Sequence, residues 1–188
     1  HFLYNTLDTI VWMAEFNDSK RVVEVTKSLA QYFRLALNQG HEQITLKDEI
    51  DHVRQYLFIQ KQRYGDKLQY EIEEDESIAD YKLPKLVLQP LVENAIYHGI
   101  KEIDRQGMIR VTSAAEEGQL ILSIYDNGRG FELRDSTDMT LPRLGGVGLK
   151  NVDQRLRLQF GDDYHMEIQS EPDKFTRISL YLPLVTDD

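Results

Sequence analysis

Residues 126–130 (DNGRG) place a carboxylate and two glycines directly after a β-rich run. Asp126, at the end of a predicted strand, could accept a hydrogen bond from an exocyclic amine such as that of adenine. Gly128 and Gly130 would let the backbone approach a ligand closely and adopt positive φ. An ordinary surface turn is the alternative for this segment taken alone.

Residues 145–149 (GGVGL) are a second such segment and lead into a predicted helix. Backbone N–H groups at a glycine-rich helix start form an anion site that suits phosphate, to which Gly146 and Gly148 would contribute. The segment lacks the lysine and hydroxyl of a Walker A loop. A flexible loop that simply enters a helix is the alternative.

Residues 93–99 (ENAIYHG) are the third segment with chemical potential. Asn94 and His98 are four residues apart and therefore share one face of a predicted helix. The asparagine carbonyl is a hard oxygen ligand suited to Mg²⁺, and His98 could contact a phosphate. Glu93 would point about 100° away from Asn94, so we do not predict it as a metal ligand. A capping and packing role is the alternative for this segment.

Rigid elements must position these segments, and the second half of the sequence predicts them. Residues 84–100 indicate a helix with a strongly apolar face, in which Pro90 marks either a kink or the true helix start. A further helix is predicted at 149–160, with strands at 108–113, 120–125, 165–170 and 175–182. This order indicates an α+β sandwich whose helices cover one face of the sheet.

The first 40 residues predict a helical hairpin with a heptad-like apolar seam. The seam residues are Leu3, Leu7, Ile10 and Ala14 in the first helix, and Val22, Val25, Leu29, Tyr32 and Ala36 in the second. Two helices cannot enclose a core by themselves. We therefore expect a second copy to complete a four-helix dimer.

A third helix is predicted to begin after Thr45, which is a good N-cap residue. Asp48 and Glu49 would follow in its first turn, where acids are favourable. The helix is predicted to end near Gly65, and residues 68–72 could form an edge strand.

Composition excludes several classes of protein. The 188 residues include 22 basic and 32 acidic side chains, and the net charge of −10 disfavours nucleic-acid binding. Because cysteine is absent, disulfides and thiolate metal sites are excluded. No apolar run approaches the roughly 20 residues that a membrane span needs. His1 opens the sequence inside a helical pattern, so we expect a longer protein whose upstream segments include any membrane sensor.

The order and spacing of the three segments resemble the N, G1 and G2 boxes of the GHKL ATP-binding superfamily, which includes histidine kinases, DNA gyrase and the MutL repair proteins. The residues that carry this resemblance are Asn94, Asp126, Gly128, Gly130, Gly146, Gly148 and Leu149. Thr176 resembles the threonine that helps to hold adenine through water in that fold. It follows Phe175, where a glycine is more usual.

The N-terminus resembles one branch of that superfamily. Residues 1–7 (HFLYNTL) are similar to the phosphoacceptor motif of the LytS- and YesM-like sensor histidine kinases, as are residues 89–95 (QPLVENA) and 148–152 (GLKNV). The resemblance implies a dimerisation and phosphoacceptor hairpin in residues 1–64. A GHKL (Bergerat) α/β sandwich that binds ATP would follow in residues 65–188.

The resemblance also implies a reaction. ATP would bind with Mg²⁺ at Asn94, and its γ-phosphate would pass to His1 and later to an aspartate on a response regulator receiver domain. The glycines of the two boxes and Leu149 would line the nucleotide site, His98 would face phosphate, and Asp126 and Thr176 would hold adenine. Residues 131–144 would form a lid. The family implies a homodimer and the cytoplasmic portion of a bacterial inner or plasma membrane protein.

Two departures from related proteins bear on mechanism. Many histidine kinases place an acid directly after the phosphoacceptor, whereas this sequence has Phe2; Asn5 or Asp8 could orient the imidazole instead. GHKL enzymes that hydrolyse ATP carry a glutamate four residues before the asparagine, where this chain has Pro90, so simple hydrolysis should be slow. A degenerate nucleotide-binding scaffold and a DNA-handling GHKL ATPase are the alternatives. We expect His41, His52 and His165 on the surface.

Overall fold

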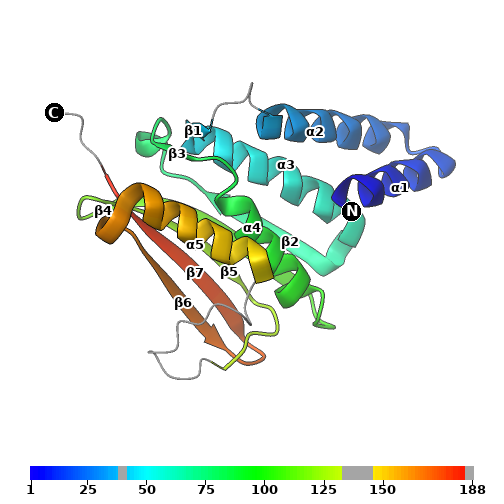
Figure 1. Cartoon of the computed structure of the whole chain (residues 1–188). Coiled ribbons are helices and arrows are strands. Elements are labelled where there is room, and N and C mark those ends of the chain that lie inside the picture. The colour runs from blue at the N-terminus through cyan, green and yellow to red at the C-terminus, as the bar shows by residue number, and fades with distance from the viewer. Residues whose placement is uncertain (38–41, 133–145, 185–188) are drawn as a thin grey trace.

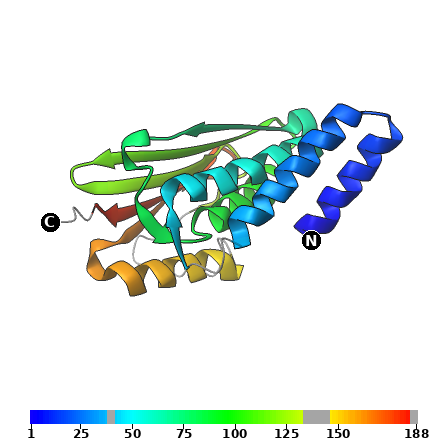
Figure 2. The ribbon, with the colours of Figure 1, turned by 90° about the horizontal axis from the view of Figure 1, so that it is seen from above.

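The computed structural model describes residues 1–37, 42–132 and 146–184. Helices occupy one side of the molecule and a twisted sheet the other (Figures 1 and 2). The elements are α1 (Phe2–Glu15), α2 (Ser19–Leu37), β1 (Gln43–Thr45), α3 (Leu46–Tyr64), β2 (Leu68–Glu73), β3 (Lys82–Pro84), α4 (Leu88–Asn94), β4 (Gly107–Glu116), β5 (Gln119–Asp126), α5 (Gly146–Phe160), β6 (His165–Glu171) and β7 (Phe175–Pro183).

Five strands form the main sheet in the order β2-β4-β5-β7-β6. The edge strand β2 runs parallel to β4, and the other neighbours are antiparallel. Along β5 every second residue is buried, as the two-residue period of a strand requires. Leu120, Leu122 and Ile124 therefore face the core, and the same alternation turns Asp126 inward.

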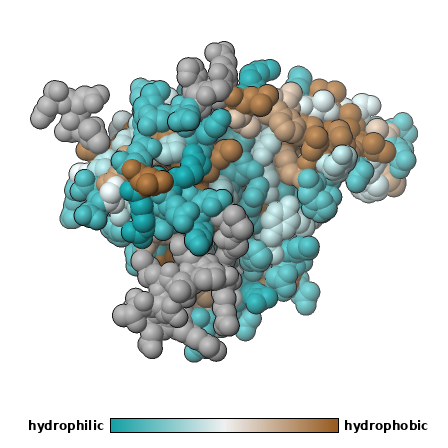
Figure 3. Space-filling view, in the orientation of Figure 1, coloured by the Kyte–Doolittle hydropathy of each residue, from teal (hydrophilic) through white to brown (hydrophobic). Residues whose placement is uncertain are grey.

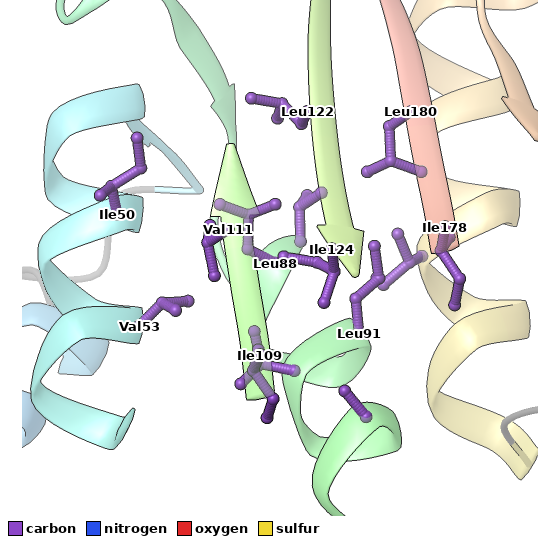
Figure 4. Packing of buried hydrophobic residues seen from close by; sticks show 14 of the residues in the cluster. Ile50, Val53, Leu88, Leu91, Ile109, Val111, Leu122, Ile124, Ile178 and Leu180 are labelled. Carbon is purple, nitrogen blue, oxygen red and sulfur yellow. The ribbon is translucent and has the colours of Figure 1, made fainter. Parts of the chain in front are cut away.

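Helices α3, α4 and α5 pack on the inner face of this sheet and close the core. Figure 4 shows Ile50 and Val53 of α3 and Leu88 and Leu91 of α4 directed toward strand residues such as Val111. Each of these side chains is at most 2% exposed. Burial of one such side chain contributes about 1.5–3 kcal/mol, so this layer is the main support for the elements that carry the polar segments.

The hairpin α1–α2 packs on α3, away from the sheet (Figure 2). Val25, Leu29 and Tyr32 of α2 are buried in this contact. The apolar side chains left exposed, which gather over the hairpin in Figure 3, include Leu3, Leu7, Val11, Trp12 and Phe16. In the part of the chain that the structure describes, no helix has the length and apolar character needed to cross a membrane.

The structure confirms the predicted α+β class and the predicted order of elements. Thr45 caps α3 by accepting a hydrogen bond from the Asp48 N–H at 3.0 Å, and Gly65 follows the helix with φ of 57°. The predicted helix start at residue 84 is wrong. Pro84 lies in β3, and α4 begins at Leu88 with Pro90 in its first turn, where a missing N–H costs nothing. The division between residues 64 and 65 stays a prediction.

His52 corrects a prediction. It was expected on the surface, but it is 1% exposed and its ring stacks on Tyr32 with centroids 4.4 Å apart. Burial lowers the pKa of His52 to about 4, so the ring packs as a neutral aromatic group. His165 is exposed as expected, and His41 lies outside the described residues.

A buried carboxylate fixes the start of α4. Glu49 is 0% exposed and accepts backbone hydrogen bonds from Leu86 at 2.9 Å and Leu88 at 2.8 Å. Leu86 has φ of 60°, a conformation that few residues other than glycine adopt. Burial raises the pKa of Glu49, while the backbone N–H groups of residues 86–88 and the charge of Arg155 oppose that rise. Glu49 therefore holds the tight turn that leads into α4.

We predict that Glu49→Ala lowers the free energy of unfolding by about 2–4 kcal/mol, because one buried and one partly buried N–H group lose their acceptor. Urea denaturation followed by circular dichroism measures this change. Glu15→Ala, at an exposed helix position, is the control and should change stability by less than about 0.5 kcal/mol. An equally small effect of Glu49→Ala would contradict the assigned role.

Candidate functional site

A cleft of about 110 Å³ lies where α4 and the end of β5 meet. Its lining brings together predicted residues that are far apart in the sequence: Asn94, His98, Asp126, Gly130 and Thr176. Asn94 ends α4, and His98 lies in η4 (Ala95–Ile100), the π-helical segment that continues it. The tertiary fold thus gathers the predicted N and G1 segments around one space.

Asp126 lies at the bottom of this cleft and is 3% exposed. The Gly128 N–H donates to its Oδ1 at 2.9 Å. Burial raises the pKa of Asp126 to about 7, and the Gly128 bond offsets part of that rise. A desolvated carboxylate with accepting capacity left over is suited to a neutral ligand that donates a hydrogen bond.

Two glycines allow the helix and the turn after β5 to touch. A Cβ on Gly128 would lie 2.4 Å from the Gly99 Cα, and a Cβ on Gly99 would lie 2.4 Å from Asp126 Oδ1. Both distances are shorter than real Cβ contacts. Gly128 was predicted to let the backbone approach a ligand closely. In the structure, the group that it approaches closely is the backbone of Gly99 in η4. Gly99 was missed as a partner because sequence spacing does not reveal the contact.

Arg105 holds the turn from outside. Its guanidinium donates to the carbonyl oxygens of Asn127, Gly128 and Asp173, at 2.5, 3.1 and 3.0 Å. The Asn127 side chain accepts from the Met108 N–H at 2.6 Å and so ties the same turn to β4. No signal in the sequence pointed to Arg105, because its three acceptors are backbone atoms.

Thr176 faces Asp126 across the β5–β7 pair, since the two residues are partners in register. The Thr176 hydroxyl lies 3.1 Å from Ser170 Oγ. Ser170 Oγ also accepts from the Phe131 N–H at 3.0 Å and donates to the Phe175 carbonyl at 2.9 Å. Ser170 is a further positioning residue that sequence reasoning missed.

A second pocket of about 170 Å³ adjoins the first and shares Asn94 and His98 with it. Gly148, in the first turn of α5, and Glu93 complete the polar side of this pocket. Asn94 Oδ1 is buried and has no hydrogen-bond partner among the described residues. An unsatisfied carbonyl oxygen beside a helix start fits a hydrated Mg²⁺ and phosphate groups.

The remaining G2 residues lie at the beginning of α5. Gly146 is the first residue of this helix. The Leu149 side chain is 1% exposed and belongs to the hydrophobic core, so any ligand contact of Leu149 would come from its backbone. Residues 133–144 of the predicted lid lie outside the described residues.

His1 and Asn5 lie away from both pockets. His1 is exposed at the start of α1, and its carbonyl accepts from the Asn5 N–H at 3.1 Å. Asn5 Nδ2 is buried without a hydrogen-bond partner in the described part of the chain. Neither residue lines the cleft at Asp126 or the pocket at Gly148. The structure therefore brings together the residues that were predicted to bind the nucleotide, but it does not place His1 beside them.

Two family models match most of the chain. The histidine kinase model matches residues 1–68. The model described as histidine kinase-, DNA gyrase B- and HSP90-like ATPase matches residues 79–186. The second match alone covers more than half of the chain and includes both pockets.

Curated relatives and solved structures agree with these matches. Sensor histidine kinase BtsS of Escherichia coli K12 is 38% identical over 97% of this chain, and sensor histidine kinase YesM of Bacillus subtilis is 35% identical over 97%. The chain spans 31% of the length of each. The histidine kinase domain of the Erythrobacter litoralis EL346 blue-light activated kinase has the same fold, with a TM-score of 0.59 at 18% identity over 95% of this chain and 87% of that one.

We predict a pH-dependent gain in stability for Asp126→Asn. The folded-state pKa of about 7 lies above the ordinary value of 3.8, so the stabilising protonated form is fully present below 3.8 and is lost as the pH rises through about 7. Near pH 4 the variant should resemble the wild type. Near pH 8 its free energy of unfolding should be higher by up to about 4 kcal/mol, as measured in urea.

Asp162→Asn, at an exposed position, is the control and should follow the wild type at every pH. If the stability of Asp126→Asn runs parallel to that of the wild type from pH 4 to pH 8, the buried carboxylate does not titrate as described.

Proposed function

Because the chain belongs to the family of LytS- and YesM-like sensor histidine kinases, we propose that it binds ATP with Mg²⁺ and transfers the γ-phosphoryl group to His1. The single observation that carries this proposal is the convergence of Asn94, Asp126 and Gly148 around two adjoining pockets. These residues come from a helix, a strand end and a helix start. Chance surface turns would not share one site.

Adenine fits the cleft at Asp126. The carboxylate would accept a hydrogen bond from the exocyclic amine, and the Thr176 hydroxyl, held beside Ser170, would act through water. Gly128 keeps the turn close to the helix, and Gly130 keeps it close to the backbone of Glu171 and Phe175, so the base would lie against backbone. Binding energy here would position the nucleotide, which is the main requirement of phosphoryl transfer.

The triphosphate fits the pocket at Gly148. The N–H groups of the first turn of α5, which contains Gly148, favour anions, and the exposed imidazole of His98 lines the same space. Mg²⁺, when bound, would neutralise phosphate charge. Asn94 Oδ1, buried and without a partner among the described residues, is the protein oxygen that would hold it.

The nucleophile would be a neutral imidazole nitrogen of His1. Asn5, one helical turn later, is the residue that we propose to orient the imidazole. Since His1 lies outside both pockets, transfer requires the hairpin to move or the histidine of a second copy to enter the site. The phosphoryl group would then pass to an aspartate of a response regulator receiver domain. Pro90 in place of a water-activating acid makes a simple ATPase the weaker alternative.

We also propose a homodimer that forms the cytoplasmic portion of a bacterial membrane sensor. The exposed apolar side chains of α1 support the dimer, because Leu3, Leu7 and Val11 repeat every four residues on one face. Membrane attachment would come from segments outside this chain, since the chain spans about a third of the length of its relatives.

We expect a version of the protein extended upstream of His1 to incorporate acid-labile label from γ-labelled ATP and Mg²⁺. His1→Gln should abolish the label because the nucleophile is lost. Asn94→Asp should reduce labelling about 100-fold or more, because the substitution puts a charged carboxylate where the site is suited to a neutral amide oxygen. Label that persists in His1→Gln would contradict the assigned phosphoacceptor.

The same experiment separates the alternatives. ATP binding without any phosphotransfer would support a degenerate nucleotide-binding scaffold. Steady-state release of phosphate that continues in His1→Gln would support a GHKL ATPase.

We expect Leu7→Glu combined with Val11→Glu to convert a dimer into a monomer, because buried charges at a helix seam are costly. Analytical ultracentrifugation measures the change. Lys20→Glu, at an exposed position on α2, is the control and should remain dimeric. A wild-type protein that sediments as a monomer at high concentration would contradict the proposed dimer.

A further inference from the structure

Three polar side chains form a row across one end of the sheet. Asp126 of β5 pairs in register with Thr176 of β7, and Thr176 pairs in register with Ser170 of the edge strand β6. Asp126 and Thr176 line the cleft of about 110 Å³ and are 3% and 6% exposed. Ser170 stands one strand further out, with its hydroxyl oxygen 3.1 Å from that of Thr176. Ser170 therefore supports a side chain of the cleft from outside it.

The hydrogen bonds of Ser170 determine the direction of its bond with Thr176. A serine hydroxyl has one proton to donate and two lone pairs that accept. The Phe175 carbonyl can only accept, so its bond of 2.9 Å with Ser170 Oγ uses the serine proton. The Phe131 N–H donates to the same oxygen at 3.0 Å and occupies one lone pair. The bond with Thr176 therefore forms only when the threonine hydroxyl donates to Ser170.

This direction leaves Thr176 without a proton for a ligand. Its single O–H points to Ser170, so toward the cleft its oxygen can only accept a hydrogen bond. The ionised carboxylate of Asp126 also only accepts. Arg129 and Glu102, which line the same cleft, are both exposed and pair with each other at 3.7 Å. The bottom of the cleft thus presents two acceptors and requires donors from its ligand.

We propose that Ser170 sets the base specificity of the nucleotide site by holding the Thr176 hydroxyl as an acceptor, an inference that rests on the proposed function. The exocyclic amine of adenine supplies donors to the two acceptors, directly or through water. Guanine carries a carbonyl oxygen at the corresponding position, so acceptors would face an acceptor. Such an unmatched contact weakens binding. Ser170 is a positioning residue, because it acts on the base through Thr176.

The test compares the affinities of ATP and GTP, each with Mg²⁺, for the 188-residue chain and its variants. Isothermal titration calorimetry, with GTP measured by competition against ATP, is made at about pH 8.5, where Asp126 with its pKa of about 7 is ionised. We expect the wild type to prefer ATP by about 100-fold or more. Ser170→Ala frees the Thr176 hydroxyl to donate to the guanine oxygen, so the preference should fall about tenfold. Ser170→Thr keeps a hydroxyl and should keep the preference.

A double-mutant cycle shows whether Ser170 acts through Thr176. Thr176→Val removes the hydroxyl that Ser170 orients, so adding Ser170→Ala should then change the preference by less than about twofold. Ser123→Ala is the matched control. The Ser123 hydroxyl pairs with that of Ser179 at 2.7 Å, also between neighbouring strands, but it lines a pocket on the outer face of the sheet. This control should keep the wild-type preference.

The outcomes separate the inference from the proposed function. An unchanged preference for ATP in Ser170→Ala would overturn the inference and leave the proposed kinase function intact. An equal loss of affinity for ATP and GTP would also overturn it, because Ser170 would then only support the turn at Phe131. A fall in preference that persists in Thr176→Val would overturn it as well. Absence of ATP binding by the wild type would instead reject the proposed function, and the inference with it.

Discussion

The contact between η4 and the turn after β5 is the constraint on which the site depends. Gly99 and Gly128 have no side chains, so the helix that carries Asn94 can lie directly against the strand end that carries Asp126. Any larger residue at either position would separate the two elements by more than an ordinary packing adjustment, because interiors are close-packed. The two pockets adjoin each other because η4 and the turn after β5 are in direct contact. Arg105 stabilises the arrangement from the outer side by bonding three backbone carbonyls.

Glu49 and Asp126 are both buried carboxylates, but Glu49 stabilises the fold whereas Asp126 faces the candidate site. Glu49 receives two backbone N–H groups and orients α4, so its accepting capacity is used within the fold. Asp126 receives one such bond and faces a cleft, which leaves capacity for a ligand. Both carboxylates lose hydration free energy on burial, and the pKa of each is raised for that reason. The core formed by α3, α4, α5 and the sheet supplies the stability that offsets this cost.

The α1–α2 hairpin has two apolar faces, one buried and one exposed. Val25, Leu29 and Tyr32 are buried against α3, whereas Leu7 and Val11 remain exposed. The buried face ties the hairpin to the helices beside the pockets through the bond from Gln89 to Tyr32. The exposed face is free to pack on another copy. The α1–α2 hairpin, which carries His1, can therefore contact the helices beside the pockets through its buried face. Its exposed face can contact the second copy in the proposed dimer.

Local patterns in the sequence determined most of the elements, because hydrophobic periods, caps and glycines act over a few residues. Thr45, Gly65 and the alternation along β5 are examples, and the spacing of Asn94, Asp126 and Gly148 indicated the family. The start of α4 was misplaced, since Glu49 fixes it through hydrogen bonds to residues 37 and 39 positions later in the sequence. Only the tertiary structure placed Gly99, Arg105, Ser170 and Glu93 at the site and buried His52. These positions depend on contacts between distant segments, and such contacts leave no periodic trace in a single sequence.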